Sequence, residues 1–128
     1  MYKVVREDVD GTLWGAFIGW PSFDNPYVIG EWKEAEPEML AFGLGLMYYR
    51  YLAEAREFRD KYTSWFLPLH AHRCEVEGPM GTPELIVCAH KTNSWYDMHW
   101  RAAISIYRCH PALPGTLMAK ALKLGTRV

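Results

Sequence analysis

The clearest periodic stretch of the chain is residues 51–62, which read YLAEAREFRDKY. Most of these residues are good helix formers, and Leu52, Ala55, Phe58 and Tyr62 recur at the spacing that gives a helix one apolar face. The pattern predicts an amphipathic helix. The charged residues of the same stretch are expected to form a solvated face, joined by i,i+3 and i,i+4 pairs.

Short apolar runs on both sides of this helix predict strands. Residues 2–6 and 12–18 favour a hairpin around a turn at 8–11, and residues 67–77 and 84–91 favour a second hairpin across GPMGTP (78–83). Further strands are expected at 27–29, 43–49 and 116–124, where Met118, Leu122 and Leu124 share one face. The acidic stretch 33–38 is expected to be exposed. Residues 95–109 fit either a helix or a strand, and their second half favours a strand.

These elements predict an α+β fold, with an antiparallel β-sheet packed with one or two helices. The chain has 128 residues, of which 50% are hydrophobic, which is enough for one core but not for two. A single small ligand-binding domain over residues 1–128 is therefore expected. The 6 Trp, 8 Tyr and 5 Phe exceed what such a domain readily buries, so we predict a homo-oligomer, a dimer or larger.

The charge balance argues against long nucleic acid as a partner, because the formal net charge is −1. A small anionic ligand is compatible with this balance, since a pocket needs only a few well-placed cations. The N-terminus lacks an apolar signal region and no segment reaches the ~18 apolar residues of a membrane span. We therefore expect a cytoplasmic protein with no membrane partner, whose cysteines at 74, 88 and 109 are reduced thiols.

Histidines and cysteines alternate along the second predicted hairpin. Cys74 opposite Cys88 would place His72 opposite His90, with His70 on the same face, and these residue types bind zinc. Packing and cross-strand polar pairs are the alternative, because a flat ladder seldom forms a tetrahedral site and a one-residue slip separates the two sets. The sequence leaves the two open, and we predict that no metal or other cofactor is required.

Motifs for catalysis are missing. The neighbours Cys109 and His110 point apart in a strand, and no GxSxG or papain-type context occurs. The glycines Gly43 and Gly45 lack the third glycine and the lysine of a phosphate loop, so a tight packing site is expected there. The sequence therefore predicts a binding protein and not an enzyme.

The best candidate for a ligand site is residues 91–101, KTNSWYDMHWR. The segment joins hydrogen-bonding groups to rings and cations, as a base, a ribose and a phosphate would need. The alternative is structural, with the tryptophans capping the core and Asn93-Ser94 forming a turn. Further phosphate donors are expected outside the segment, because guanidinium binds phosphate in a bidentate manner. The candidate ligand-binding residues are Thr92, Asn93, Trp95, Arg101, Arg108 and Arg6.

The order of YKVVR (2–6), GEW (30–32), PGTL (114–117) and KL (123–124) resembles that of small phage-encoded proteins. Among these, the chain most resembles the anti-Thoeris proteins that sequester cyclic ADP-ribose isomers. The resemblance implies a non-enzymatic oligomer that encloses an intact signal molecule where subunits meet, using the Asn93 region and Arg108. The strand 85–88 offers no ring for adenine, so Trp95 or a ring from another subunit would stack on it.

The function expected from these features is sequestration of a nucleotide-derived signal of the cyclic ADP-ribose isomer type, which would block antiviral defence signalling in the host cytoplasm. Two alternatives remain. One is an ADP-ribosyltransferase-like enzyme, because small antiparallel domains hold NAD-like ligands. The other is an inhibitor that blocks a host protein through an aromatic patch.

Overall fold

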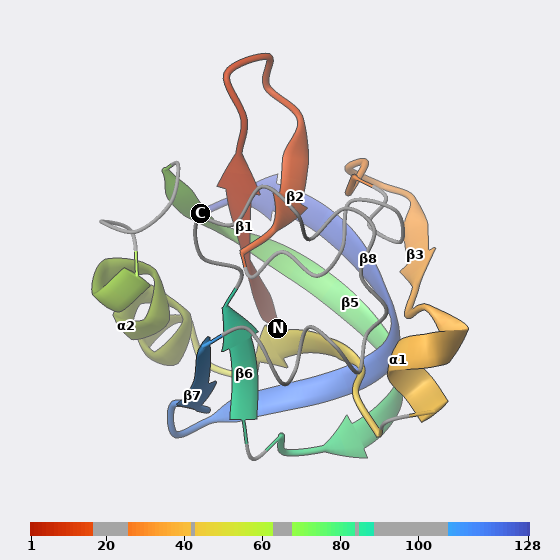
Figure 1. Cartoon of the computed structure of the whole chain (residues 1–128). Coiled ribbons are helices and arrows are strands. Elements are labelled where there is room, and N and C mark those ends of the chain that lie inside the picture. The colour runs from red at the N-terminus through yellow and green to blue at the C-terminus, as the bar shows by residue number, and fades with distance from the viewer. Residues whose placement is uncertain (17–25, 42, 63–67, 84, 89–107) are drawn as a thin grey trace.

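The computed structural model describes residues 1–16, 26–41, 43–62, 68–83, 85–88 and 108–128, and its main feature is a strongly curved antiparallel sheet (Figure 1). The elements in chain order are β1 (Tyr2–Glu7), β2 (Leu13–Gly15), β3 (Trp32–Glu34), α1 (Pro37–Ala41), β4 (Leu46–Tyr49), α2 (Leu52–Tyr62), β5 (Leu69–Gly81), β6 (Leu85–Cys88), β7 (Arg108–Pro111) and β8 (Thr116–Arg127). The predicted sheet-dominated α+β fold is confirmed. No helix among the described residues is long and apolar enough to cross a membrane.

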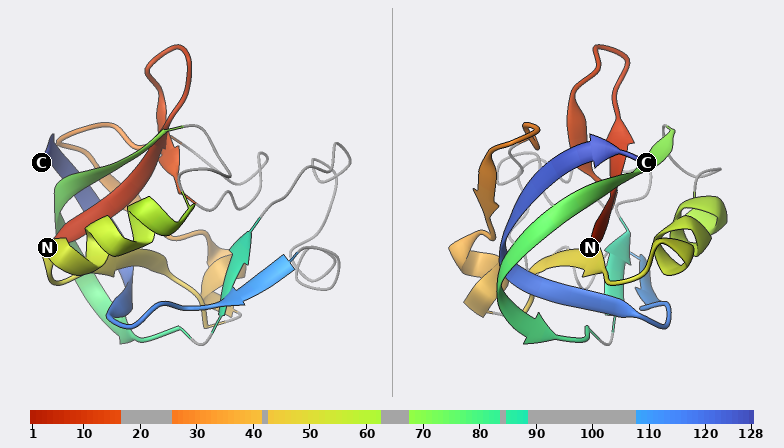
Figure 2. Two further views of the ribbon diagram at one scale, coloured as in Figure 1. Left: turned by 90° about the vertical axis from the view of Figure 1, so that its left-hand side faces the viewer. Right: turned by 180° about the vertical axis from the view of Figure 1, so that it is seen from behind.

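The six-stranded sheet closes into a barrel-like shape. The long strands β5 and β8 pair antiparallel and curve together around the molecule (Figure 2). The strand β5 also pairs antiparallel with β1. On its other edge β8 pairs with β4, and the bridge between Tyr2 and Tyr49 joins β4 back to β1. The strands β2 and β3 extend the sheet beyond this ring, and β6 and β7 form a separate two-stranded sheet.

Several local predictions are confirmed. The helix α2 spans nearly the whole of residues 51–62, and Ala55, Phe58 and Tyr62 are buried on its predicted apolar face. The strands β1 and β2 form the first hairpin, although residues 17 and 18 of the predicted strand lie outside the described part. The final strand is present as β8 and is longer than expected. A strand at the end of 95–109 begins at Arg108, and the preceding residues of that stretch lie outside the described part.

The second predicted hairpin is wrong. The strand β5 continues through Gly78, Pro79 and Met80 to Gly81 and pairs with β8, whereas β6 pairs with β7. The register shifts between Pro79 and Gly81, and Gly78 has a φ of 63°. The glycines and the proline therefore mark an irregularity in a curved strand, which favours the same residues as a chain reversal does.

The strand predicted at 27–29 is also wrong. Only Tyr27 bridges to Leu13, and the strand β3 lies farther along, paired with β8. The stretch 33–38 is not uniformly exposed, because Ala35 is buried and Lys33 is half-buried. The acidic composition of this stretch did not predict the exposure of each residue, because side chains alternate between the two faces of a strand.

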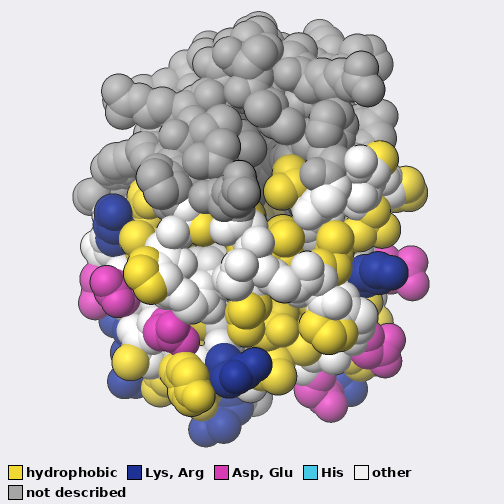
Figure 3. Space-filling model, turned by 90° about the horizontal axis from the view of Figure 1, so that it is seen from below, with side chains coloured by type: hydrophobic (Ala, Val, Ile, Leu, Met, Phe, Trp, Pro, Cys, Tyr) yellow, Lys and Arg dark blue, Asp and Glu magenta, His cyan; other side chains and the backbone are white. Residues whose placement is uncertain are grey.

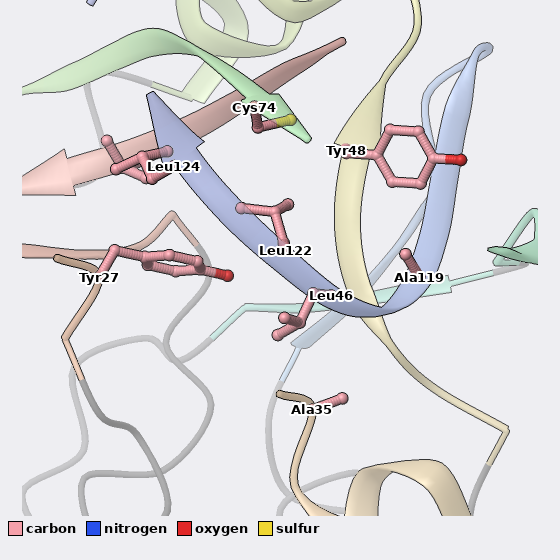
Figure 4. Packing of buried hydrophobic residues seen from close by; sticks show 9 residues of the cluster. Tyr27, Ala35, Leu46, Tyr48, Cys74, Ala119, Leu122 and Leu124 are labelled. Carbon is pink, nitrogen blue, oxygen red and sulfur yellow. The ribbon is translucent and has the colours of Figure 1, made fainter. Parts of the chain in front are cut away.

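The apolar core has two parts on opposite faces of the sheet. Outside the barrel, α2 packs Ala55, Phe58 and Tyr62 against a cluster that contains Val4 and Leu69. The second cluster lies within the curve of β8 (Figure 4). It contains Val5, Tyr27, Ala35, Leu46, Tyr48, Cys74, Ala119, Leu122 and Leu124. Leu122 and Leu124 share this cluster as predicted, but Ala119 stands there instead of Met118 because β8 does not alternate evenly along its length.

The start of β8 is held by hydrogen bonds of Thr116 and lies close to α2. Thr116 Oγ1 lies 2.7 Å from Leu113 O and 3.2 Å from Tyr49 Oη. A hydroxyl has one hydrogen, so Thr116 donates it to the carbonyl and accepts from Tyr49. The Glu54 carboxylate lies against Gly115, where an added Cβ would collide with it. The prediction of a solvated charged face on α2 holds only in part, because Glu54 and Arg59 are half-buried.

Candidate functional site

Most of the predicted ligand-binding residues belong to the segment between β6 and β7. Thr92, Asn93, Trp95 and Arg101 lie in residues 89–107, outside the described part of the chain. The two ends of this segment are placed, because Cys88 pairs with Arg108 in the β6–β7 ladder. Arg108 therefore lies at the first residue of β7, where the segment rejoins the described part of the chain.

Arg6 lies in the first hairpin, directly opposite Trp14 of β2. Directly opposite residues of an antiparallel pair share one face of the sheet. The Arg6 side chain is half-buried and its Nε is buried, as is the indole nitrogen of Trp14. Within the described part of the chain, the Trp14 N–H has no hydrogen-bond acceptor. The pair combines a permanent cation with an N–H donor, and both groups bind anionic or carbonyl oxygens.

Trp14 was missed as a candidate from the sequence. Its position follows from the hairpin register Val5–Gly15, Arg6–Trp14 and Glu7–Leu13. The turn at 8–11 was predicted, so this register was within reach of the sequence pattern, and it was the only signal that could link Trp14 to Arg6. A lone tryptophan on a predicted strand indicates core packing first.

Polar side chains also enter the core, where Lys3 has defined partners. The Lys3 ammonium is buried, donates to Met47 O at 2.7 Å and lies 5.5 Å from the centre of the Tyr27 ring. Cys74 is buried as well, and burial raises the pKa of its thiol to about 11, although the charge of Lys3 acts in the opposite direction. The thiol therefore stays protonated at neutral pH and is a poor nucleophile.

The predicted histidine and cysteine face does not form. In the structure Cys74 pairs with Leu124, and Cys88 pairs with Arg108, so the proposed register of His72 opposite His90 is wrong. His90 itself lies outside the described part. His70 instead contacts Glu7, with 2.9 Å between Nε2 and Oε2. Among the residues that the structure describes, no group of three or more metal-ligating side chains comes together.

His72 is a buried neutral group with one defined partner. Its Nδ1 lies 2.9 Å from the carbonyl oxygen of Gly125, which can only accept, so Nδ1 carries the hydrogen. Burial lowers the pKa of His72, and the neighbouring His70 and Arg127 lower it further, while the hydrogen bond to Gly125 opposes them. The ring therefore supports the end of β8 in its neutral form.

A pH-dependent loss of stability follows for His72. Because the folded-state pKa lies below the ordinary 6.5, the unfolded chain takes up the proton first as the pH falls. The free energy of unfolding is expected to be unaffected by this group above pH 6.5 and to decrease below it. Urea unfolding of the parent and of His72→Gln at a series of pH values measures the effect. A parent and variant with the same pH slope would contradict it.

At the lower end of the barrel, the residues that the structure describes form no continuous basic track. In the described part of this face, hydrophobic side chains gather centrally, and lysines and arginines alternate with acidic residues around the margin (Figure 3). This mixed distribution agrees with the near-zero net charge and does not favour a polyanion on this face.

Fold and site together define a small barrel-like α+β domain with an arginine directly opposite a tryptophan on its first hairpin. Comparison of the chain with protein-family models, with curated proteins and with solved structures found no match.

Proposed function

We propose that this protein binds a nucleotide-derived signalling molecule of the cyclic ADP-ribose isomer type and sequesters it intact, thereby blocking antiviral defence signalling in the host cytoplasm. The observation that supports this most is the Arg6–Trp14 pair. Leaving the buried Trp14 N–H without an acceptor costs about 1–3 kcal/mol, and an oxygen of a bound ligand would offset that cost.

The remaining groups suit the other parts of such a ligand. Its base calls for a ring such as Trp95, its ribose hydroxyls for Thr92 and Asn93, and its diphosphate for Arg101 and Arg108. The pairing of Cys88 with Arg108 supports a shared role for Arg108 and the segment residues, because it keeps both ends of the segment 89–107 side by side. The resemblance to anti-Thoeris proteins suggests that the pocket is completed where subunits meet.

The proposal is tested by recovering the ligand after binding. The purified protein is incubated with cyclic ADP-ribose isomers or NAD, separated from free ligand and denatured, and the released molecules are identified by chromatography and mass spectrometry. We expect a cyclic ADP-ribose isomer to be recovered unchanged. Recovery of an altered ligand would support the ADP-ribosyltransferase-like alternative. Failure to bind any of these ligands would overturn the proposal and favour the protein-inhibitor alternative.

Calorimetry of hairpin variants tests whether the Arg6–Trp14 pair contributes to ligand binding. Arg6→Ala removes the cation, and Trp14→Phe removes the N–H while keeping a ring. Each is expected to weaken binding by roughly tenfold to a hundredfold, because a hydrogen bond to a charged group contributes about 1.5–3 kcal/mol. Arg73→Ala is the matched control, since Arg73 is an exposed arginine on β5, and it is expected to bind normally.

Alanine substitutions at the segment residues complete the series. Asn93→Ala, Trp95→Ala, Arg101→Ala and Arg108→Ala are each expected to weaken binding by a similar factor, provided that circular dichroism shows a folded variant. Wild-type affinity in all of these variants and in both hairpin variants would contradict the pocket, even if the parent protein binds the ligand.

A further inference from the structure

Three large apolar side chains are exposed close together in the chain, just before and within β3. The exposed fractions are 50% for Val28, 52% for Ile29 and 44% for Trp32. The backbone beneath them is well anchored, because Glu31 N–H donates to Val28 O at 3.0 Å and Gly30 N–H donates to Leu124 O at 2.8 Å. An ordered turn that presents apolar groups to solvent is typical of an interaction surface.

The strand β3 also has a free edge within the described part of the chain, where it pairs with β8 alone. Figures 1 and 2 place β3 at the margin of the molecule, on the side away from α2. Such an edge offers backbone N–H and C=O groups to a strand of another chain.

The hydrogen bond from Ala35 N–H to Lys120 O determines which backbone groups of β3 face outward. Residues of an antiparallel strand direct their N–H and C=O groups alternately to one neighbour and the other. The ladder with β8 is regular from Trp32 onward, so Lys33 bonds to β8 as Ala35 does, whereas Trp32 and Glu34 direct their backbone groups to the outer edge. Gly30, which also bonds to β8, lies in the turn before this ladder. A second β3 strand related by a twofold axis can therefore pair only in registers centred on Trp32, Lys33 or Glu34.

Charge complementarity selects one of these three registers. A centre at Lys33 places two lysines directly opposite each other, and a centre at Glu34 places two glutamates opposite each other. Like charges in these positions are destabilising. A centre at Trp32 instead pairs Trp32 with its own copy and brings Glu31, the residue just before β3, opposite Lys33 twice, while the Lys33 ammonium also lies 4.2 Å from the centre of the Tyr27 ring in its own chain. Cross-strand aromatic pairs and opposite charges each contribute about 0.2–1 kcal/mol.

We propose that a second copy of this chain docks on the surface formed by Val28, Ile29 and β3, with the two β3 edges paired about a twofold axis at Trp32. This pairing joins the two barrels into one continuous sheet. It covers the apolar turn and gives the outward backbone groups of Trp32 hydrogen-bond partners. The Lys123 ammonium of β8 lies 5.4 Å from the Trp32 ring centre and 2.8 Å from Glu75 Oε2, and the Trp32 side chain remains 44% exposed. The pairing needs no ligand, so it stands independently of the proposed function.

Sedimentation equilibrium without ligand, at tens of micromolar protein, tests this surface. We expect the mass of the parent to approach twice that of one chain. Trp32→Glu places two carboxylates at the axis and is expected to raise the dissociation constant at least tenfold, giving a single-chain mass. Tyr51→Glu is the matched control, because Tyr51 is an exposed aromatic residue, 62% accessible, that immediately precedes α2.

Charge reversal tests the register. Glu31→Lys places a lysine opposite Lys33 and is expected to weaken the dimer, whereas the double variant Glu31→Lys/Lys33→Glu restores opposite charges and is expected to recover it. Circular dichroism of each variant excludes unfolding as the cause. A parent that sediments as a single chain would overturn the proposal. So would a dimer that persists unchanged in both Trp32→Glu and Glu31→Lys.

Discussion

Replacing Leu122 with alanine is expected to lower the free energy of unfolding by about 2–5 kcal/mol, as large-to-small substitutions do in well-packed cores. The Leu122 side chain is fully buried inside the curve of β8 (Figure 4). Its backbone pairs with Lys33 of β3 on one side and Val76 of β5 on the other. The surrounding strands are tied together at this point, so they cannot collapse fully into the cavity that the substitution leaves.

Urea unfolding followed by circular dichroism measures this loss as a lower midpoint with an unchanged slope. Val9→Ala is the control, because Val9 is 93% exposed in the turn between β1 and β2 and its truncation is expected to cost less than about 0.5 kcal/mol. If Leu122→Ala unfolds at the same urea concentration as Val9→Ala, the barrel interior is not the main core.

The second large effect is expected at Gly45, where even one methyl group has no room. A Cβ at this position would lie 2.6 Å from Ala119 O and 2.6 Å from Met80 Sδ. The neighbouring residue, Leu46, pairs with Ala119, so the backbone of β8 cannot move away without disturbing the β4–β8 ladder. Gly45→Ala is expected to destabilise the protein by about 1–3 kcal/mol, the usual cost of overpacking.

A double variant separates the two contacts at Gly45. Gly45→Ala/Met80→Ala relieves the contact with sulfur but not the contact with the carbonyl oxygen, so it is expected to remain less stable than Met80→Ala alone. Equal urea midpoints for these two variants would show that the flexible methionine, and not the backbone of β8, resists the added methyl group.

The sequence predictions succeeded where an element depends on residues that are close together in the chain. The helix at 51–62 and the hairpin at 2–18 depend on residues near one another in the chain. The helix is present as α2, and the described part of the hairpin is present as β1 and β2. The tight packing expected at Gly43 and Gly45 holds for Gly45, whereas Gly43 has a φ of 73° and open space around it. A glycine pair alone does not distinguish a backbone turn from a close approach, because both favour a residue without Cβ.

The pairing of β5, β6 and β8 and the burial of the Arg6–Trp14 pair depended on long-range contacts. The segment GPMGTP suits a turn or a bulge equally well, and closure of β5 onto β8 selects the bulge. Arg6 was a candidate from its residue type, but its proximity to the buried Trp14 N–H needed the hairpin register and the burial that the folded sheet provides. Local patterns can specify an element because its backbone conformation depends on neighbouring residues. They cannot specify which elements meet, because that depends on the mutual burial of distant apolar surfaces.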